Sequence, residues 1–493
     1  MSTSTVEKDY GYNTAKLWQV GFFTLNNTST NLHMFILGFV SYYATGMAGL
    51  AVMLISTILM ATRLFDGLID PTIGYIIDKT ESKFGKFRPL IILGNIISAG
   101  TIIAVYSVTH LLPEAFQLVF FVAMLVINKI GYSLQTSVTK AAQSALTNNP
   151  KQRPLYAIFD GIYNVGVFTG GQIFVSSYLM AKHGAFNMGL FTELNSYGLI
   201  LSGVFAILAV IGISAKDRKE FYGVGEETTE TKLRDYWPVI KGNRPLQMLS
   251  LSASMDKLAT SLLRQPVVVV MLFGILLGDY ALSGTVGLIT IIPTLLITFA
   301  GVAIARKTGL KKAYVTSAWI GMLSFIALIV FFLILDDPTM ISFESIGIYT
   351  ILFIVLYALA YGFAQLPTTL VVPMIADVSD YETAKSGRYV PGMMGTIFSF
   401  VDQLVSSLAP TIVGAVVAMI GFTSAFPEAG DPLTQPLLMA TLALAFGLPA
   451  LGLVISVVAM KFYKLDAKKM EEIQTGISAI KEKAKQKGDS VAG

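Results

Sequence analysis

The sequence predicts an all-α membrane protein, and three observations support that class. Of its 493 residues, 54% are hydrophobic and 13% are charged, whereas an average soluble domain has about 25% charged residues. The mean hydropathy is +0.66. Apolar runs of about 20 residues or more, long enough to cross a bilayer as helices, recur along the chain. The chain has no cysteine, which excludes disulfides and thiolate metal sites.

Twelve apolar stretches are predicted to be transmembrane helices. They cover residues 17–44, 50–77, 89–111, 116–146, 154–182, 195–214, 246–277, 280–305, 311–335, 345–376, 391–421 and 435–463. Several are longer than a bilayer requires, which indicates tilted or bent helices.

The loops between these stretches alternate in charge. Lys and Arg gather in every second loop, as in 79–88, 216–244 and 306–312, whereas the other loops hold almost none apart from Lys182. Excess Lys and Arg marks the cytoplasmic side of a membrane. We therefore expect a multi-pass protein of the cell membrane with both termini in the cytoplasm.

One long polar interruption divides the chain into halves. We expect an N-terminal six-helix bundle over residues 1–214, a central cytoplasmic loop over 215–244, a C-terminal six-helix bundle over 245–463 and a cytoplasmic tail over 464–493. GYIIDKTESKFGKFR follows the second span and GVAIARKTGLKKAY follows the eighth, and this echo indicates a duplicated unit, a layout of secondary transporters. The tail is typical of an amphipathic helix with a solvated Lys-rich face, and contact with anionic membrane lipid is the alternative.

The stretch RLFDGLIDPTIGYIID, residues 63–78, places charges inside an apolar span. Asp66 and Asp70 are one helical turn apart and project from one face. A lipid-facing Asp would cost at least about 2.5–3.5 kcal/mol, so both are expected to face a polar cavity. Two close carboxylates favour a bound cation, which makes the pair a candidate site for a coupling ion, H⁺ or Na⁺.

A structural role is an alternative interpretation for some of these charges. Arg63 could simply neutralise Asp66, although Asp70 would then stay unpaired. Asp78 lies next to Lys79 and near Lys86, and we expect it to make a structural contact at a gate rather than to take part in transport.

Further ionisable residues lie within the predicted spans, and such residues are functional candidates. They are Lys129, Lys140, Asp160, Asp256, Lys257, Arg264, Asp402 and His33. Internal pairing, of Lys140 with Asp160 or of Asp256 with Arg264, is an equally weighted alternative. For His33 we expect a packing role.

Enzymatic functions are not supported, and we expect a protein that is not an enzyme and has no cofactor. No H-E-x-x-H, G-x-S-x-G or P-loop motif is present. A membrane sensor that binds solute without transporting it is conceivable on the same frame. A structural protein would leave the intramembrane acids unexplained.

The motif of the second span resembles the signature of the glycoside–pentoside–hexuronide:cation symporters, the group that contains the melibiose carrier. The matching residues are Arg63, Phe65, Asp66, Asp70, Pro71, Gly85, Lys86, Phe87, Arg88 and Pro89. MIADVSDYETAKSGR and FYKLD are similar to two later segments of that family. The resemblance implies a major-facilitator fold and cation-coupled uptake by alternating access.

Carried over to this chain, the resemblance implies that Asp66 and Asp70 are the cation carboxylates, with Thr136 as a third ligand. Other positions depart from the family. Ile69 replaces an Asn, and the acids of the galactoside carriers fall near Asn27 and on Thr139. The span-five Arg appears as Asp160 or Gly161, and the span-eleven Lys falls on Gln403. The ion site is therefore expected to be retained and the galactoside site to be lost.

We expect a symporter of a glycoside, pentoside or hexuronide, and the alternative is a proton-coupled carrier of a non-sugar amphiphile or organic anion. The expected substrate-binding residues are Asn27, Asn31, Tyr132, Thr139, Lys140, Asp160, Asp256, Arg264 and Gln403. The expected gate and structural residues are Arg63, Asp78, Gly85, Lys86 and Arg88. No metal is expected beyond Na⁺ at Asp66 and Asp70. The expected partners are a small-molecule substrate and membrane lipid, with no nucleic acid, for a monomer.

Overall fold

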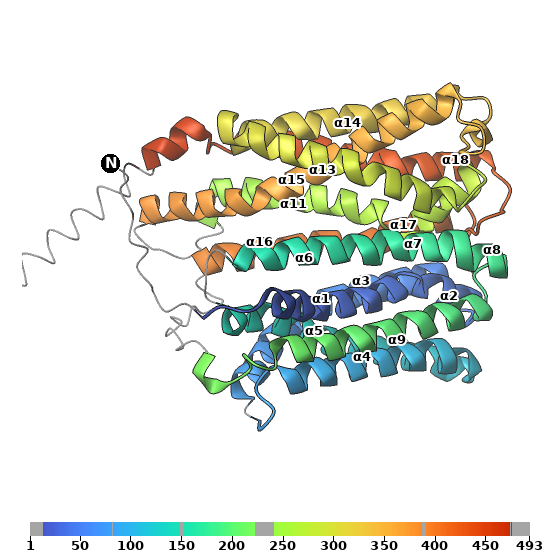
Figure 1. Ribbon diagram of the computed structural model, residues 1–493. Coiled ribbons are helices and arrows are strands. Elements are labelled where there is room, and N and C mark those ends of the chain that lie inside the picture. The colour runs from blue at the N-terminus through green and yellow to red at the C-terminus, as the bar shows by residue number, and fades with distance from the viewer. Residues whose placement is uncertain are drawn as a thin grey trace, which may run out of the picture. The chain divides into compact units, whose positions relative to one another are not determined.

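The computed structural model describes residues 13–80, 82–147, 152–221, 241–386 and 391–473 and residue 475, and this part of the chain is helical and contains no strand (Figure 1). Its contacts divide the chain into two compact units, Met1–Thr228 and Thr229–Gly493. The boundary between the units falls within the predicted central loop.

The first unit is built from helices that correspond to the first six predicted spans. They are α1 (Leu17–Gly38), α2 (Val40–Gly46), α3 (Val52–Lys79), α4 (Arg88–Val108), α5 (Glu114–Leu146), α6 (Arg153–Val165), α7 (Gly171–Ile173), α8 (Met180–His183) and α9 (Met188–Ile213). Two π-helical segments, Gly166–Gly170 and Phe174–Leu179, join α6, α7 and α8 into one long rod. Short 3₁₀ turns cover Thr109–Leu111 and Lys219–Phe221.

The second unit follows the same order of elements. It holds α11 (Arg244–Leu263), α12 (Pro266–Val269), α13 (Leu282–Thr308), α14 (Leu310–Ile334), α15 (Ile348–Ser386), α16 (Pro391–Ser406), α17 (Ala409–Met419), α18 (Gln435–Leu442) and α19 (Leu448–Phe462). The π-helical segments Val270–Leu276 and Ala443–Gly447 extend α12 and join α18 to α19, and a 3₁₀ turn covers Pro338–Met340.

Local sequence explains where these helices begin and end. The side chain of Asn187 accepts the Leu190 amide at 3.0 Å at the start of α9, and Asn243 accepts the Leu246 amide at 2.9 Å at the start of α11. Both are N-caps that satisfy an otherwise free helix donor. Gly309, with φ of 92°, permits the sharp turn between α13 and α14.

Each of the twelve predicted spans coincides with helical segments, and the class of all-α membrane protein is confirmed. Within the described residues, eight helices are long and apolar enough to cross a membrane, or nine when the bent pair Arg244–Leu263 and Pro266–Leu276 is counted as one span. The full count of twelve crossings stays a prediction.

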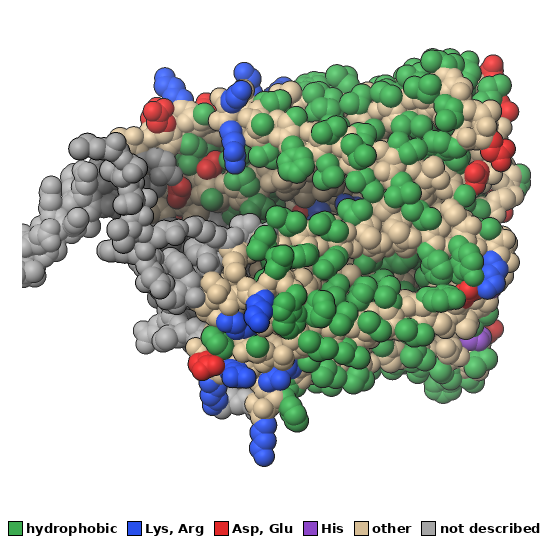
Figure 2. All heavy atoms as spheres, viewed as in Figure 1, with side chains coloured by type: hydrophobic (Ala, Val, Ile, Leu, Met, Phe, Trp, Pro, Cys, Tyr) green, Lys and Arg blue, Asp and Glu red, His purple; other side chains and the backbone are tan. Residues whose placement is uncertain are grey.

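Each unit has its own core, and its outward faces are apolar. In the first unit α1 packs against α9, α6 and α5, and α3 and α4 each pack against α5. In the second unit α11 packs against α19, α16 and α15, and α14 against α15 and α19. Hydrophobic side chains cover the visible sides of the helices, and Lys and Arg gather toward one end of each unit (Figure 2). This pattern suits a lipid-facing belt with a basic end.

Candidate functional site

The predicted cation site lies on α3, which is continuously helical through Asp66 and Asp70. The helical backbone places these two positions one turn apart on one face. The side chains of Asp66, Asp70 and Asp78 lie outside the described part of the structure. Arg63 is exposed and has an interaction partner.

Thr136, the predicted third ligand, lies on the neighbouring helix. α3 and α5 pack against each other, and Thr136 is half-buried on α5. Its hydroxyl donates to the main-chain oxygens of Tyr132 at 3.1 Å or Ser133 at 3.3 Å. The lone pairs of the Thr136 oxygen therefore stay free to accept a donor or a cation.

Three of the predicted substrate residues meet in one hydrogen-bonded chain between α1 and α6. Asn27 donates its amide to Asp160 Oδ1 at 2.6 Å, and Asn164 donates to Asp160 Oδ2 at 3.0 Å. Asn31 donates to Asn164 Oδ1 at 2.5 Å. All four side chains are half-buried. This Asn–Asp chain presents alternating donors and acceptors on one side of the first unit.

The Asn–Asp chain corrects one of the pairings considered from the sequence. Asp160 takes neutral amide donors, and Lys140 is exposed on α5 with no ion pair to Asp160 among the described residues. The sequence did not single out Asn164. The available signal was its spacing, because Asn164 follows Asp160 by one helical turn just as Asn31 follows Asn27.

Two further predicted residues on α5 have different surroundings. Tyr132 is half-buried, with the Lys129 ammonium 5.1 Å from its ring centroid, a cation–π contact. Thr139 is buried, and its hydroxyl accepts from Asn26 Nδ2 at 2.7 Å. In this conformation Thr139 therefore contributes to the packing of α5 against α1.

In the second unit the predicted residues Asp256 and Arg264 do not pair. Asp256 is 1% exposed and accepts hydrogen bonds from Tyr314 and Ser456. Arg264, at the end of α11, is exposed and donates to the neutral amide oxygen of Gln365 on α15 at 3.3 Å. The pairing of Asp256 with Arg264 considered from the sequence is therefore wrong.

The surroundings of Arg264 are open and partly aromatic. No carboxylate of a described residue forms an ion pair with Arg264. On α15, one turn before Gln365, Tyr361 stacks on Tyr357 with ring centroids 4.0 Å apart. Gln403, on α16, is exposed. An uncompensated guanidinium of this kind is suited to an acidic or hydroxyl-bearing ligand.

Three of the residues predicted to form a gate or structural contact, Gly85, Lys86 and Arg88, lie around a buried acid that the sequence did not reveal. Asp217 accepts the backbone amides of Lys86 at 2.9 Å, Phe87 at 3.1 Å and Arg88 at 3.0 Å. The Arg88 Nε also donates to Asp217 at 3.3 Å. Gly85 has φ of 94°, and a Cβ there would collide with the Asp217 carboxylate. The Gly-Lys-Phe-Arg turn therefore receives Asp217 as a cap for α4.

A related contact occurs in the second unit. Glu382, in the segment MIADVSDYETAKSGR, is buried and accepts from Asn243 Nδ2 at 2.8 Å. Asn243 in turn caps α11. Lys385 donates to the Gly242 carbonyl at 2.5 Å. Glu382 thus ties the end of α15 to the start of α11.

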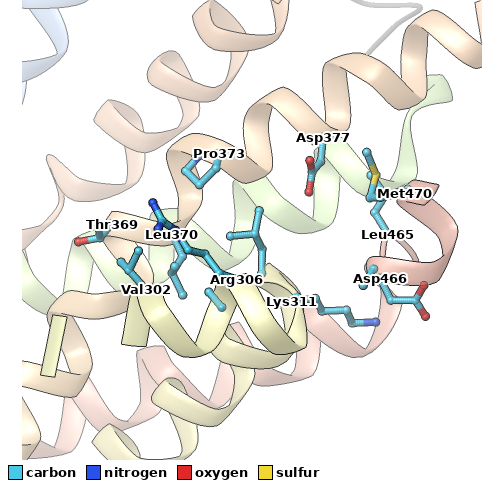
Figure 3. A pocket seen from close by; sticks show the side chains of 14 residues that line it. Val302, Arg306, Lys311, Thr369, Leu370, Pro373, Asp377, Leu465, Asp466 and Met470 are labelled. Carbon is cyan, nitrogen blue, oxygen red and sulfur yellow. The ribbon is translucent and has the colours of Figure 1, made fainter. Parts of the chain in front are cut away.

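A cavity of about 530 Å³ lies elsewhere in the second unit, at the junction of α13, α14 and α15 with residues 465–470. Its ionisable lining residues are Arg306, Lys311, Asp377 and Asp466 (Figure 3). None of the predicted substrate residues lines it. Within the described part of the chain, no group of three or more His, Cys, Asp or Glu side chains could hold a metal ion.

Comparison with known proteins decides the family. The chain matches the family MFS/sugar transport protein over residues 20–467. It belongs to that family. This agrees with the resemblance carried by the α3 motif, to the cation symporters of the major facilitator superfamily.

Relatives of this chain are identical to it at about a fifth to a quarter of the aligned residues. The lactose permease of Leuconostoc lactis is 23% identical over 425 residues, which are 80% of this chain and 61% of the permease. The chain therefore spans less than two thirds of that relative. The inner membrane symporter YicJ of Escherichia coli (strain K12) is 22% identical over 463 residues, which are 91% of this chain and 92% of the symporter.

The fold is confirmed by solved structures. The crystal structure of the nucleoside transporter NupG superposes with a TM-score of 0.57 at 13% identity, covering 90% of this chain and 99% of that one. A bacterial homologue of the iron transporter ferroportin, in an inward-facing state, gives a TM-score of 0.59 at 12% identity, with coverages of 91% and 98%. The chain has the major-facilitator fold.

Proposed function

We propose that the protein is a secondary active transporter that couples the entry of a glycoside, pentoside or hexuronide to the entry of H⁺ or Na⁺ by alternating access. It lies in the cell membrane with both termini in the cytoplasm and acts as a monomer without a cofactor. The family match and the symporter and lactose permease relatives support the class of activity.

The observation that carries the proposal is the pair of carboxylates at Asp66 and Asp70, one turn apart within the continuous helix α3. Two acids at one place in a membrane helix are expensive unless a cation or proton offsets their charge. Thr136 lies on the helix packed against α3 and has oxygen lone pairs to offer. Cation binding there would favour substrate binding, and reciprocity requires the converse.

The Asn–Asp chain supplies the groups that a sugar requires. Asn27, Asn31, Asp160 and Asn164 offer amide donors, amide acceptors and one carboxylate from two adjoining helices. Sugar hydroxyls both donate and accept, so a row of alternating donors and acceptors suits them. Tyr132 adds an aromatic ring from α5, the helix that packs against α1.

A specific observation favours an acidic substrate within this class. Arg264 is exposed, and its described hydrogen bond goes to the neutral Gln365 amide. A substrate carboxylate would form a charge-assisted bidentate pair with the guanidinium. Arg264 therefore supports a hexuronide among the sugars, and it also supports the second candidate function, proton-coupled transport of a non-sugar organic anion.

The test is uptake into proteoliposomes under an imposed H⁺ or Na⁺ gradient, with neutral glycosides, hexuronides and non-sugar organic anions as solutes. Wild type should accumulate one class under one gradient. Asp70→Asn removes a carboxylate of the proposed cation pair and should abolish accumulation. The matched control is Asp336→Asn, which removes a carboxylate from an exposed loop and should accumulate solute as wild type does.

Three outcomes would redirect the proposal. Full accumulation by Asp70→Asn would exclude the cation pair as the coupling site. Accumulation of organic anions but not of hexuronides would establish the second candidate. Binding of a solute, detected as a shift in melting temperature, with no flux under any gradient would make the protein a sensor.

A further inference from the structure

A buried polar cluster joins the first and last helices in each unit, and the two clusters are built from corresponding helices. The first helix, the third span and the last helix of each unit supply them. The first-unit cluster consists of Ser29, His33, Asn95 and Ser202, and the second-unit cluster consists of Ser252, Asp256, Tyr314 and Ser456. All eight side chains are buried, at 9% exposed or less.

The centre of each cluster is the same pair of serines. Ser29 Oγ lies 2.8 Å from Ser202 Oγ and donates to the Ser202 carbonyl at 3.0 Å. Ser252 Oγ lies 2.5 Å from Ser456 Oγ and donates to the Ser456 carbonyl at 3.1 Å. The first and last helices of each unit are thus joined by the same contact.

A third side chain closes each cluster from the third span. Asn95 Nδ2 donates to Ser29 and Ser202, both at 2.9 Å. The Tyr314 hydroxyl lies 2.8 Å from Ser252 Oγ and 3.0 Å from Ser456 Oγ. The two clusters therefore use corresponding helices, the same contact between two serines, and a third side chain from the third span.

The clusters differ one turn beyond the first serine. His33 occupies that position in the first unit, with Nε2 2.8 Å from Ser202 Oγ. Asp256 occupies it in the second unit, where Oδ2 accepts from Tyr314 and, at 3.2 Å, from Ser456. A neutral imidazole can be buried at a modest cost. An ionised carboxylate in the same place would be a buried charge.

No cationic side chain in the described part of the second unit offsets such a charge. Asp256 Oδ1 is buried and has no hydrogen-bond partner, and no Lys, Arg or His forms an ion pair with Asp256. Lys257, next along α11, forms no ion pair with Asp256 among the described residues. The titratable group that faces Asp256 is Tyr314 of α14, while α19 contributes Ser456.

Several other ionisable groups on the helices around Asp256 lie elsewhere. Arg264 of α11 bonds to α15, Glu382 of α15 bonds to Asn243, and Lys385 of α15 bonds to Gly242. Asp377 of α15 lines the cavity of Figure 3, and Lys461 is in the last turn of α19. None of them hydrogen-bonds to the Asp256 carboxyl.

We propose that Asp256 is a proton-binding site of the second unit, at which the closed cluster holds the carboxyl group in its neutral form. A buried, unpaired charge costs far more free energy than a buried neutral carboxyl, which costs only the desolvation of a polar group. The serine and tyrosine hydroxyl groups already hydrogen-bond to one another, so their oxygens are engaged within the cluster. The two donors on Oδ2 stabilise the ionised form once water reaches the cluster, and the proton can then leave.

The site is separate from Asp66 and Asp70, which belong to the first unit, and it does not depend on which solute is carried. It gives the second unit a titratable group of its own. The serine pair and Tyr314 join α11, α14 and α19, so loss of the proton would weaken the packing of these three helices by placing a charge between them.

Infrared spectroscopy of the purified protein tests the proposal directly, because protonated and ionised carboxyl groups absorb at separate frequencies. At neutral pH the wild-type spectrum should contain a protonated-carboxyl band that is lost in Asp256→Asn. The band should persist in the Asp66→Asn/Asp70→Asn double variant, which separates this proposal from the proposed coupling site.

A second pair of variants tests the role of the cluster. Tyr314→Phe removes a donor to the ionised form, so the band should persist to a higher pH than in wild type. Ser250→Ala is the matched control, because Ser250 is also buried on α11 but has no bond to Asp256, and it should leave the titration unchanged. Should Asp256→Asn fail to fold, the Tyr314→Phe titration decides. Absence of the band at neutral pH, or an identical titration in Tyr314→Phe and wild type, would overturn the proposal.

Discussion

The two units use one scaffold for two different polar interiors. In each unit a serine pair joins the first helix to the last and a group from the third span closes the cluster. The first unit completes its cluster with an imidazole and an amide, and the second with a carboxyl group and a phenol. The helix-joining contact is therefore common to both units, while the ionisable chemistry is particular to each.

The buried acids at the helix ends also differ between the two units. Asp217 of the first unit accepts the backbone amides of Lys86, Phe87 and Arg88, whereas the described bond to Glu382 of the second unit comes from the side-chain amide of Asn243. The acid of the first unit thus caps main-chain donors of a helix, whereas the described bond of the second acid joins two side chains. This difference can be measured, because the two acids are both buried and can be truncated in the same way.

The largest expected effect comes from Asp217→Ala. The change leaves three backbone donors and the Arg88 guanidinium without their shared acceptor, at a cost of about 3 kcal/mol or more in the free energy of unfolding. Glu382→Ala should cost less, about 1–3 kcal/mol. Thermal unfolding in detergent checks the order. A smaller loss of melting temperature for Asp217→Ala than for Glu382→Ala would contradict the assignment.

A smaller effect is expected when the serine on the last helix of each cluster is truncated. Ser202→Ala removes the partner of His33, Asn95 and Ser29, and Ser456→Ala removes the partner of Ser252, Tyr314 and Asp256. Each should cost about 1–3 kcal/mol. Ser456→Ala should also shift the titration of the Asp256 band, whereas Ser202→Ala should not. If the Asp256 band titrated at the same pH in Ser456→Ala and in Ser202→Ala, the hydrogen bond from Ser456 would have no effect on the Asp256 carboxyl group, contrary to this account.

The smallest effect is expected in the C-terminal tail, where Lys469 and Glu472 form an exposed ion pair. Lys469 Nζ lies 2.7 Å from Glu472 Oε2, and the hydrogen bond from Lys469 lowers the pKa of the Glu472 carboxyl. Its contribution is present above the ordinary carboxyl pKa and is lost as the pH falls through the lowered value. Because both groups are solvated, Glu472→Gln should leave the melting temperature unchanged at neutral and at acidic pH. A clear loss of melting temperature in Glu472→Gln at neutral pH would contradict this expectation.

The sequence predicted the helical class, and its apolar stretches coincide with helical segments of the described structure, because apolar length is a local signal. It also predicted the continuous helix through Asp66 and Asp70, since a four-residue spacing is itself helical. It included Asn27, Asn31 and Asp160 among the candidate substrate residues, but it did not predict that their side chains are linked by hydrogen bonds. Asp217 escaped notice because its partners lie about 130 residues away. Such contacts depend on tertiary packing, which no local pattern encodes.

The buried clusters illustrate the same limit. Ser29 and Ser202 are 173 residues apart, and Ser252 and Ser456 are 204 apart. Serines are common in membrane helices, and nothing in their spacing distinguishes these four. The sequence placed Asp256 with either substrate or Arg264, whereas packing gives it two hydroxyl donors and a closed environment.

The central claim is that Asp66 and Asp70 couple the solute to a cation. The most direct measurement is the entry of protons or radioactive sodium into proteoliposomes when solute is added without an imposed gradient. Wild type should take up the cation only when solute is present, and Asp70→Asn should show no solute-dependent cation entry. Solute entry without cation entry in wild type, or undiminished cation entry in Asp70→Asn, would contradict the account.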